Sequence, residues 1–283
     1  PRFDLWFNAH QHLGTLPEEY RDCTTPLDIS RKIGVGGHMI VPDYLRPEEP
    51  EGMHDRGLGA YRLPMIPYRA EFRGVERMVD TAGGRTRAAY HTPKGTVTVE
   101  WEFTPDMRRS GASISWIRKH AITEEADYAP VEWLFERFEA EPAYAGLKRI
   151  IRETGGDAVT VANGSMAASP MQFIMRDLMD MNFFFFQLMD APERLARLAR
   201  AIGGYFERFM PLAAACPAEV IIFGANTDET ITYPPFYEEH ILPWARRFTD
   251  LAHERGKLVL LHADGENRGL FDLYRQSGID VLE

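Results

Sequence analysis

The feature that most constrains the fold is an alternation of short apolar stretches with longer amphipathic stretches along the chain. Short apolar stretches are typical of buried strands, and amphipathic stretches are typical of the helices between them. Because parallel strands need such crossover connections, the pattern predicts an α/β protein built from repeated β/α units. The predicted strands cover residues 4–8, 36–41, 158–162, 219–223 and 257–262, and a sixth begins at 281–283.

The predicted helices lie between these strands, and one of them has clear start and stop residues. Pro234 and Pro235 suit a first helical turn, where the N–H that proline lacks would have no partner. Gly256 suits the carboxyl end of the same helix, where a left-handed backbone is favoured. The predicted helices cover residues 27–33, 171–180, 191–214, 235–255 and 270–277, and two more run from 123 to about 154.

One segment interrupts the β/α order. Residues 85–91 and 96–103 alternate apolar and polar side chains around Thr92-Pro93-Lys94-Gly95, which predicts a β-hairpin with a tight turn. We interpret residues 84–104 as an insertion on a single (β/α)8 barrel domain that spans residues 1–283. A closed barrel needs eight strands, so about two further β/α units are expected to follow Glu283.

The composition excludes several classes of protein. The 283 residues are 45% hydrophobic, which is enough to bury the core of one large domain. The net charge of −10 and the interspersed charges argue against a nucleic-acid partner. No apolar stretch approaches the roughly 20 residues of a membrane span, and the first residues are not a secretory signal. Two cysteines exclude a disulfide framework, so a cytoplasmic location and a buried structural thiol at Cys216 are expected.

Polar side chains follow two of the predicted strands, where barrel enzymes place their active sites. Asn226, Asp228 and Glu229 follow one strand, and His262 and Asp264 end the next. His262 and Asp264 are two positions apart, so strand geometry points both side chains the same way. This pair suits half of a metal site, or a histidine oriented by a carboxylate. The alternative is a hydrogen-bonded histidine that closes the barrel mouth, beside an aspartate that starts a turn.

The first predicted strand offers a second group of candidates, Asn8, His10 and His12. A His-x-His pair at the end of a first barrel strand is typical of amidohydrolase metal enzymes. The alternative is a loop with two solvated histidines. We expect Asn8 and His10 to contact the substrate.

Residues 220–283 resemble the uroporphyrinogen decarboxylase superfamily. Members have a strand that ends in Gly-Asp-Asp/Asn, a helix with Leu-Pro-Tyr/Trp, and a strand that ends in His-x-Cys/Asp-Gly. The corresponding stretches here are Ile222-Phe223-Gly224-Ala225-Asn226, Leu242-Pro243-Trp244 and His262-Ala263-Asp264-Gly265. The resemblance is weaker over residues 92–144. It implies a (β/α)8 barrel with its active site at the mouth.

The superfamily contains two chemistries. Its decarboxylases place an Arg-rich segment after the first strand to bind substrate carboxylates, whereas residues 8–14 here contain no arginine. Asp43 lies where a decarboxylase aspartate could lie. Its zinc methyltransferases move a methyl group between a corrinoid protein and a thiol, and their ligands match His262 and a cysteine two residues later. That position is Asp264 here, so the resemblance implies zinc or another divalent metal.

We therefore predict a metal-assisted methyltransferase. His262 and Asp264 would ligate the metal, Asp228 or Glu229 would be a further ligand or a base, and Asn226 would orient the substrate. A corrinoid protein would dock over the barrel mouth. The alternatives are a metal-free decarboxylase that uses Asp43, an amidohydrolase-type metallohydrolase, and a barrel that binds a ligand without catalysis.

Overall fold

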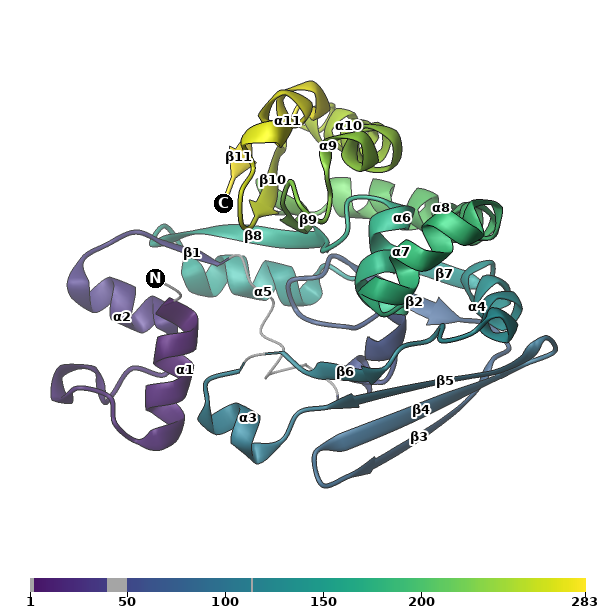
Figure 1. The fold of residues 1–283 in the computed structure, drawn as a ribbon. Helices are drawn as coiled ribbons and strands as arrows, with labels where there is room; N and C mark the ends of the chain where they lie inside the picture. The colour runs from purple at the N-terminus through teal and green to yellow at the C-terminus, as the bar shows by residue number, and fades with distance from the viewer. Residues whose placement is uncertain (1–2, 40–49, 113) are drawn as a thin grey trace.

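A computed structural model describes residues 3–39, 50–112 and 114–283. Its main sheet is parallel and has the strand order β1-β8-β9-β10-β11 (Figure 1). The strands are β1 (Gly37–Met39), β8 (Ala158–Ser165), β9 (Val220–Thr227), β10 (Leu258–Ala263) and β11 (Val281–Leu282). The predicted α/β class is confirmed. Among the described residues this sheet is open and has five strands, so a closed barrel stays a prediction.

The two faces of the parallel sheet are both apolar, as expected for parallel strands that are covered on each side. On one face Phe223 of β9 stacks on Phe248 of helix α10 (Leu242–His253), with ring centroids 4.0 Å apart. The long helix α8 (Pro192–Ala214) packs there too, through Phe206. A smaller cluster on the opposite face contains Val161, Val220, Ile222 and Leu260. This second face matters for the site, because polar side chains follow its apolar residues towards the carboxyl ends of the strands.

The predicted first strand at 4–8 is wrong, because this segment lies in helix α1 (Phe3–Leu13). Trp6 and His10 are four residues apart, and their rings lie 4.9 Å apart on one side of the helix. Phe7 is buried against Leu16, Cys23 and Ile29. The apolar residues were read as a strand because four or five residues are too few to distinguish the two periods. The first parallel strand is β1, which confirms the prediction at 36–41 as far as residues 37–39.

The predicted hairpin is confirmed as β4 (Arg85–Thr92) and β5 (Gly95–Glu102), which pair antiparallel. It belongs to a larger antiparallel sheet, because β3 (Glu76–Ala82) and β6 (Trp116–Lys119) extend it on either side. Strands β2 (Tyr68–Phe72) and β7 (Phe138–Pro142) form a further antiparallel pair. Strand β7 divides the region where two consecutive helices were predicted.

The remaining predicted helices are observed near their expected positions, with several breaks. The helix predicted at 171–180 is observed as α6 (Pro170–Phe173) followed by the π-helix η5 (Ile174–Leu178). The helix predicted at 235–255 contains a second π-helix, η6 (Tyr237–Ile241). Such wide turns are frequent at functional sites. The other helical elements are α2 (Pro26–Ile33), α3 (Pro105–Arg109), α4 (Tyr128–Phe135), α5 (Ala145–Thr154), α6 (Pro170–Phe173), π-helix η5 (Ile174–Leu178), α7 (Met181–Asp190), α9 (Pro234–Phe236), π-helix η6 (Tyr237–Ile241) and α11 (Phe271–Ser277), with short 3-10 turns η1 (Glu18–Tyr20), η2 (Pro50–Met53), η3 (Arg56–Leu58), η4 (Glu125–Asp127) and η7 (Arg268–Leu270).

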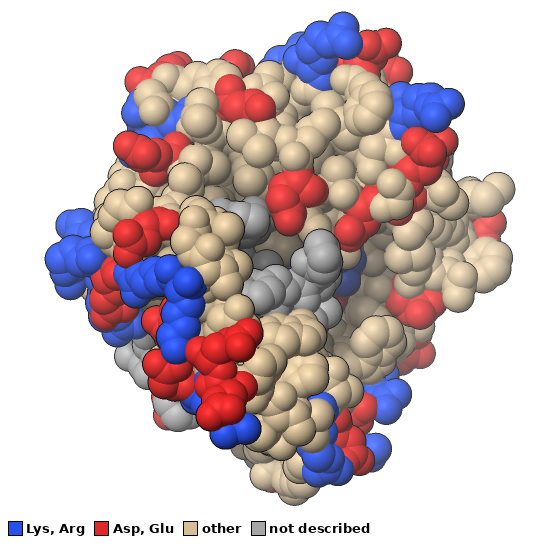
Figure 2. All heavy atoms as spheres, turned by 90° about the vertical axis from the view of Figure 1, so that its left-hand side faces the viewer, with Lys and Arg blue, Asp and Glu red and all other residues tan. Residues whose placement is uncertain are grey.

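The surface carries charges of both signs. Figure 2 shows basic and acidic side chains side by side on the face that it presents, as the sequence pattern predicts. No helix in the described part of the chain is both long enough and apolar enough to cross a membrane. Cys216 is buried with 1% of its surface exposed, and burial raises the pKa of its thiol. A buried neutral thiol is the structural cysteine that the sequence predicts.

Candidate functional site

The carboxyl edge of β10 places His262 between two carboxylates. Its Nδ1 atom forms a short contact with Glu283 Oε2, and its Nε2 atom lies 3.5 Å from Asp264 Oδ1. Parallel pairing of β10 with β11 explains the first contact, because it brings the end of β11 beside His262. The structure therefore brings His262 and Asp264 together as the spacing predicts. It also adds Glu283, for which the sequence predicts only a strand.

The second sheet face contains the His262 side chain. Leu260 belongs to the apolar cluster of that face, and His262 lies two residues further along the same strand. The His262 side chain is 22% exposed and that of Asp264 is 53% exposed, so solvent reaches both. No group of three or more His, Cys, Asp or Glu side chains in the described ranges is arranged to hold a metal ion.

Asp228 and Glu229 lie in the loop after β9 and are engaged in holding it. Asp228 Oδ1 accepts hydrogen bonds from the N–H groups of Thr230 and Ile231, at 2.7 and 2.9 Å. Glu229 Oε2 accepts one from the Gly269 N–H at 2.6 Å and so ties this loop to the loop after β10. Both carboxylates thus stabilise the loop through hydrogen bonds. Their predicted role as a metal ligand or a base stays a prediction.

Asn226 has the only left-handed backbone of any non-glycine residue in the described ranges, with φ of 56°. It is exposed although its neighbours in β9 are buried. Gly224, two residues earlier, also has a positive φ, and a Cβ there would lie 2.7 Å from Leu261 Cδ1. Strained backbone that points a polar side chain to solvent is frequent at binding sites. Asn226 therefore presents its side chain to solvent near the carboxyl end of β9, and its predicted role in orienting the substrate stays a prediction.

This conformation predicts opposite effects for two substitutions at one position. We expect Asn226→Gly to leave the free energy of unfolding unchanged or to raise it by less than about 1 kcal/mol, because glycine adopts positive φ freely. We expect Asn226→Val to lower it by about 1–2 kcal/mol, because a Cβ-branched residue is strained there. Urea denaturation of both variants measures the difference. Equal stabilities would contradict the assignment of strain.

The other predicted site residues are not brought to this edge. His10 lies in the last turn of α1 and its Nδ1 atom is 2.9 Å from Thr15 Oγ1. Asn8 lies in the same helix, which packs with α2 and α3 away from β9 and β10 (Figure 1). The amidohydrolase alternative therefore loses the strand that it requires. Asp43 lies outside the described residues.

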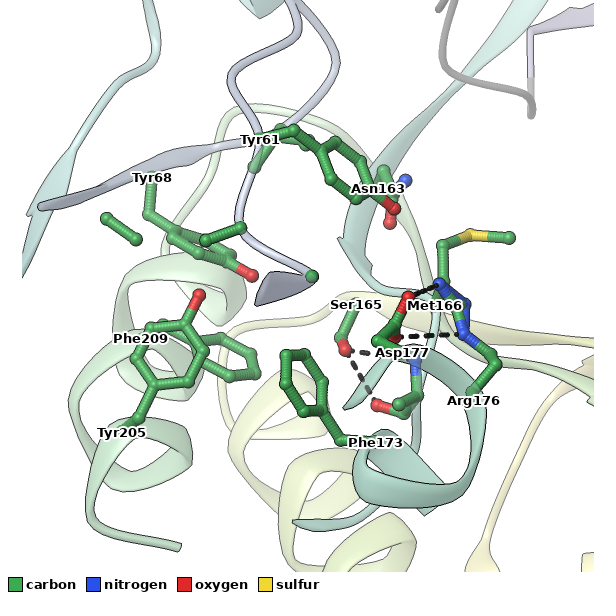
Figure 3. Close-up of a pocket in the computed structure, with 15 residues that line it drawn as sticks. Tyr61, Tyr68, Asn163, Ser165, Met166, Phe173, Arg176, Asp177, Tyr205 and Phe209 are labelled. Atoms are coloured by element: carbon green, nitrogen blue, oxygen red, sulfur yellow. Dashed lines mark hydrogen bonds and ion pairs between the residues drawn. The ribbon is translucent and has the colours of Figure 1, made fainter. Parts of the chain in front are cut away.

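A pocket opens at the carboxyl end of the neighbouring strand β8. It contains about 430 Å³ of space not filled by protein atoms, part of it open to solvent. Asn163 and Ser165 of β8 line it, and Figure 3 shows the rings of Tyr61, Tyr68, Phe173, Tyr205 and Phe209 around it. Ser165 Oγ donates to the Ala167 carbonyl at 2.7 Å, which stabilises the turn after the strand.

A buried ionic group lies at one side of the pocket. Arg176, in π-helix η5, makes two hydrogen bonds to the carboxylate of Asp177, at 3.0 and 3.1 Å (Figure 3). Arg56 Nη1 lies 3.6 Å from the same carboxylate, and the side chains of Arg56 and Asp177 are 7% and 4% exposed. Two guanidinium groups thus share one carboxylate in a poorly solvated place, and Arg56 Nε and Nη1 have no hydrogen-bond partner.

Burial keeps several titratable groups near this pocket neutral. Tyr68 and Tyr205 share a side-chain hydrogen bond, and burial raises the pKa of both phenols well above the ordinary value. His120 is 3.4 Å from the Asp177 carbonyl oxygen, and burial lowers the pKa of its ring. These groups therefore act as neutral hydrogen-bonding groups near pH 7.

Buried histidines predict that the protein loses stability in mild acid. Burial lowers the pKa of His54, His120 and His240 below the ordinary 6.5. As the pH falls through about 6.5, the unfolded chain takes up these protons before the folded chain does, so the folded state becomes less stable. We expect urea midpoints to fall from pH 7.5 to pH 5.5. The fall should be smaller in His120→Gln, and an unchanged midpoint in the wild type would contradict this.

The sequence did not point to the pocket residues Asn163, Arg176 and Asp177, nor to Arg56, which contacts Asp177. A usable signal was present, since Arg176-Asp177 is an isolated charged pair inside an apolar helical stretch. Asn163 also follows the apolar residues of a predicted strand. Asn226 and His262 were identified as candidates because they are polar residues at the ends of predicted strands. Arg56 could not be found in this way, because only the fold brings it to Asp177.

Comparison with known proteins finds no family model that matches this sequence and no curated protein that is significantly similar to it. The class that the fold defines is a mixed α/β protein with a parallel sheet whose carboxyl edge carries polar side chains.

Proposed function

We propose that the chain is a uroporphyrinogen decarboxylase-superfamily barrel that catalyses metal-assisted methyl transfer. The methyl group would move between a corrinoid, supplied by a partner protein, and a thiol. The sequence resemblance over residues 220–283 supports the family, and the open parallel sheet is compatible with the barrel. The observation that carries the proposal is the environment of His262.

The two ring nitrogens of His262 have different partners, as a metal ligand requires. In the tautomer with a proton on Nδ1, Glu283 accepts a hydrogen bond from this nitrogen and Nε2 keeps the lone pair that a metal needs. Nε2 lies 3.5 Å from Asp264 Oδ1. That distance is long for a hydrogen bond, yet two ligands of one tetrahedral zinc ion are about 3.3 Å apart. His262 and Asp264 therefore fit a shared divalent cation.

The residues at the site divide the remaining tasks. A bound zinc ion would lower the pKa of a coordinated thiol and so make it a nucleophile near neutral pH. Glu283 fixes the orientation of the His262 ring, and Asn226 presents an amide to solvent at the end of β9. We place the thiol in front of His262 and Asp264, and the corrinoid partner over the same edge.

Glu283→Gln tests the role of the second carboxylate. We expect the variant to bind zinc about 10–100-fold more weakly than the wild type, because an amide orients the ring less strongly than a carboxylate. Zinc affinity is measured by competition with a chromophoric chelator. Glu254→Gln, at an exposed carboxylate after α10, is the control and should bind zinc normally. Methylcobalamin consumption with a thiol acceptor tests the reaction itself.

A second candidate function, decarboxylation of a carboxylated substrate, gains support from one observation. The lack of arginine in residues 8–14 counts against decarboxylation only if residues 4–8 form the first strand. Because that strand is a helix, the segment to inspect follows β1, and Arg56 is buried there with unpartnered N–H groups. Release of carbon dioxide that is abolished by Asp43→Asn would favour this function over methyl transfer.

A further inference from the structure

The turn after β10 holds Asp264 by its backbone and not by its carboxylate. Among the described residues no hydrogen bond reaches the Asp264 carboxylate, and the ionic partner close to it is His262 Nε2, at 3.5 Å. The Asp264 N–H donates to the Thr227 carbonyl at 3.0 Å, and the Asp264 carbonyl accepts from Asn267 Nδ2 at 2.7 Å. The position of the carboxylate beside His262 therefore depends on the backbone of this turn.

Tyr274 holds the Asn267 side chain from the buried side. Its hydroxyl group forms a hydrogen bond with Asn267 Oδ1 and lies 3.0 Å from Thr227 Oγ1. Tyr274 belongs to helix α11 and is 3% exposed, and Thr227 is fully buried at the end of β9. Burial raises the pKa of Tyr274 to about 12, so the phenol keeps its proton near pH 7.

The bonding capacity of these groups fixes the direction of each hydrogen bond. The Asn267 amide directs its NH2 group at the backbone carbonyls of Asp264 and Gly265, because only this group can donate. Its oxygen can only accept, so the single phenol proton of Tyr274 goes to Asn267 Oδ1. The Thr227 hydroxyl then donates to the Tyr274 oxygen. The hydrogen bonds thus run in one direction, from the buried end of β9 to the Asp264 carbonyl.

The turn also packs closely on the loop after β9. Gly265 has a φ of 63°, and a Cβ there would lie 3.2 Å from Asp228 Cβ. The Glu229 N–H donates to the Glu266 carbonyl at 2.8 Å. A change in the hydrogen bonds of the turn would therefore shift its backbone against a close neighbour.

We propose that Tyr274 and Asn267 are positioning residues that set the separation between Asp264 and His262. Neither residue would touch the metal or the substrate. Tyr274 orients the Asn267 amide, and the amide fixes the backbone from which the Asp264 carboxylate extends. The control of the turn follows from these hydrogen bonds, whereas its effect on metal binding rests on the proposed function.

Zinc affinity in a double-mutant cycle tests the positioning. Tyr274→Phe removes one hydroxyl group and keeps the ring, and we expect it to bind zinc about 3–10-fold more weakly than the wild type, as for the loss of one hydrogen bond. Asn267→Ala should weaken zinc binding at least as much. Because Tyr274 acts through Asn267, adding Tyr274→Phe to Asn267→Ala should weaken it no further. Tyr233→Phe, at an exposed phenol in the loop after β9, is the matched control and should bind zinc normally.

Hydrogen exchange in the presence of EDTA gives a readout that needs no metal. The Asp264 N–H should exchange about 3–10-fold faster in Tyr274→Phe and in Asn267→Ala than in the wild type. The hairpin of β4 and β5 should exchange at the wild-type rate in both variants. Equal acceleration of the turn and the hairpin would indicate a general loss of stability and would overturn the proposal, as would unchanged exchange in the turn.

The two readouts separate this proposal from the metal proposal. If the wild type bound no zinc, the proposed function would fail, and the exchange rates would decide whether Tyr274 and Asn267 control the turn. If the wild type bound zinc, normal affinity in both single variants would overturn the positioning role. Additive losses of affinity in the double variant would overturn it too, because Tyr274 would then act by a route other than Asn267.

Discussion

His262→Ala is expected to abolish stoichiometric zinc binding. Removing the imidazole takes away one of the two proposed ligands, and it leaves Asp264 and Glu283 as two exposed carboxylates without a common partner. Loss of an oriented outer carboxylate already weakens metal affinity about 10–100-fold, so loss of the ligand itself should weaken it by at least about 100-fold. Zinc content after dialysis, measured by atomic emission, gives the stoichiometry.

His91→Ala is the matched control, because His91 is exposed on strand β4 of the antiparallel sheet. It should keep the zinc content of the wild type. If His262→Ala retained one zinc ion per chain, the metal would lie elsewhere, and His262 would be the hydrogen-bonded histidine of the alternative interpretation.

Asp177→Ala is expected to destabilise the fold more than any other single carboxylate change proposed here. The Asp177 side chain is 4% exposed and faces both Arg176 and the 7% exposed Arg56. Removing one partner of a buried ion pair leaves an uncompensated charge, which typically costs about 3–5 kcal/mol. Urea denaturation at pH 7.5 should show a loss of this size in the free energy of unfolding.

Asp272→Ala gives the comparison for an exposed pair. The Asp272 side chain is 83% exposed and lies 3.4 Å from Arg275, in a pair one helical turn apart. Such pairs contribute roughly 0–1 kcal/mol, so this variant should be nearly as stable as the wild type. A loss below about 1 kcal/mol for Asp177→Ala would mean that solvent reaches the Arg56–Asp177–Arg176 group and compensates it.

The later part of the chain could be predicted from sequence because its local signals agree with one another. The apolar run at 219–223, the Pro234-Pro235 helix start and Gly256 all indicate β9, the helix and β10, which the structure contains. The strand predicted at 4–8 is wrong, because the few apolar residues of this segment fit the period of a helix as well as that of a strand. Its helix is decided by the packing of Phe7 on Leu16, Cys23 and Ile29.

The sequence likewise predicts one part of the candidate site and not the other. The spacing of His262 and Asp264 on one strand predicted their proximity, because side chains two apart in a strand point the same way. Glu283 was visible only as a strand residue, and its contact with His262 depends on which strand pairs with β10. Strand pairing is a tertiary property, so periodicity could not reveal it.

The sequence by itself determined the order of the β/α units from β8 onwards, the hairpin and the polar strand ends, because each depends on neighbours within a few residues. Only the tertiary structure decided that His10 lies in a helix and not at the end of a strand, and that Arg56 contacts Asp177, which lines a pocket together with Asn163. The contact between Arg56 and Asp177 joins segments more than 100 residues apart. The strength of this contact depends on burial, because charges attract more strongly where solvent is excluded, and no local sequence pattern encodes that burial.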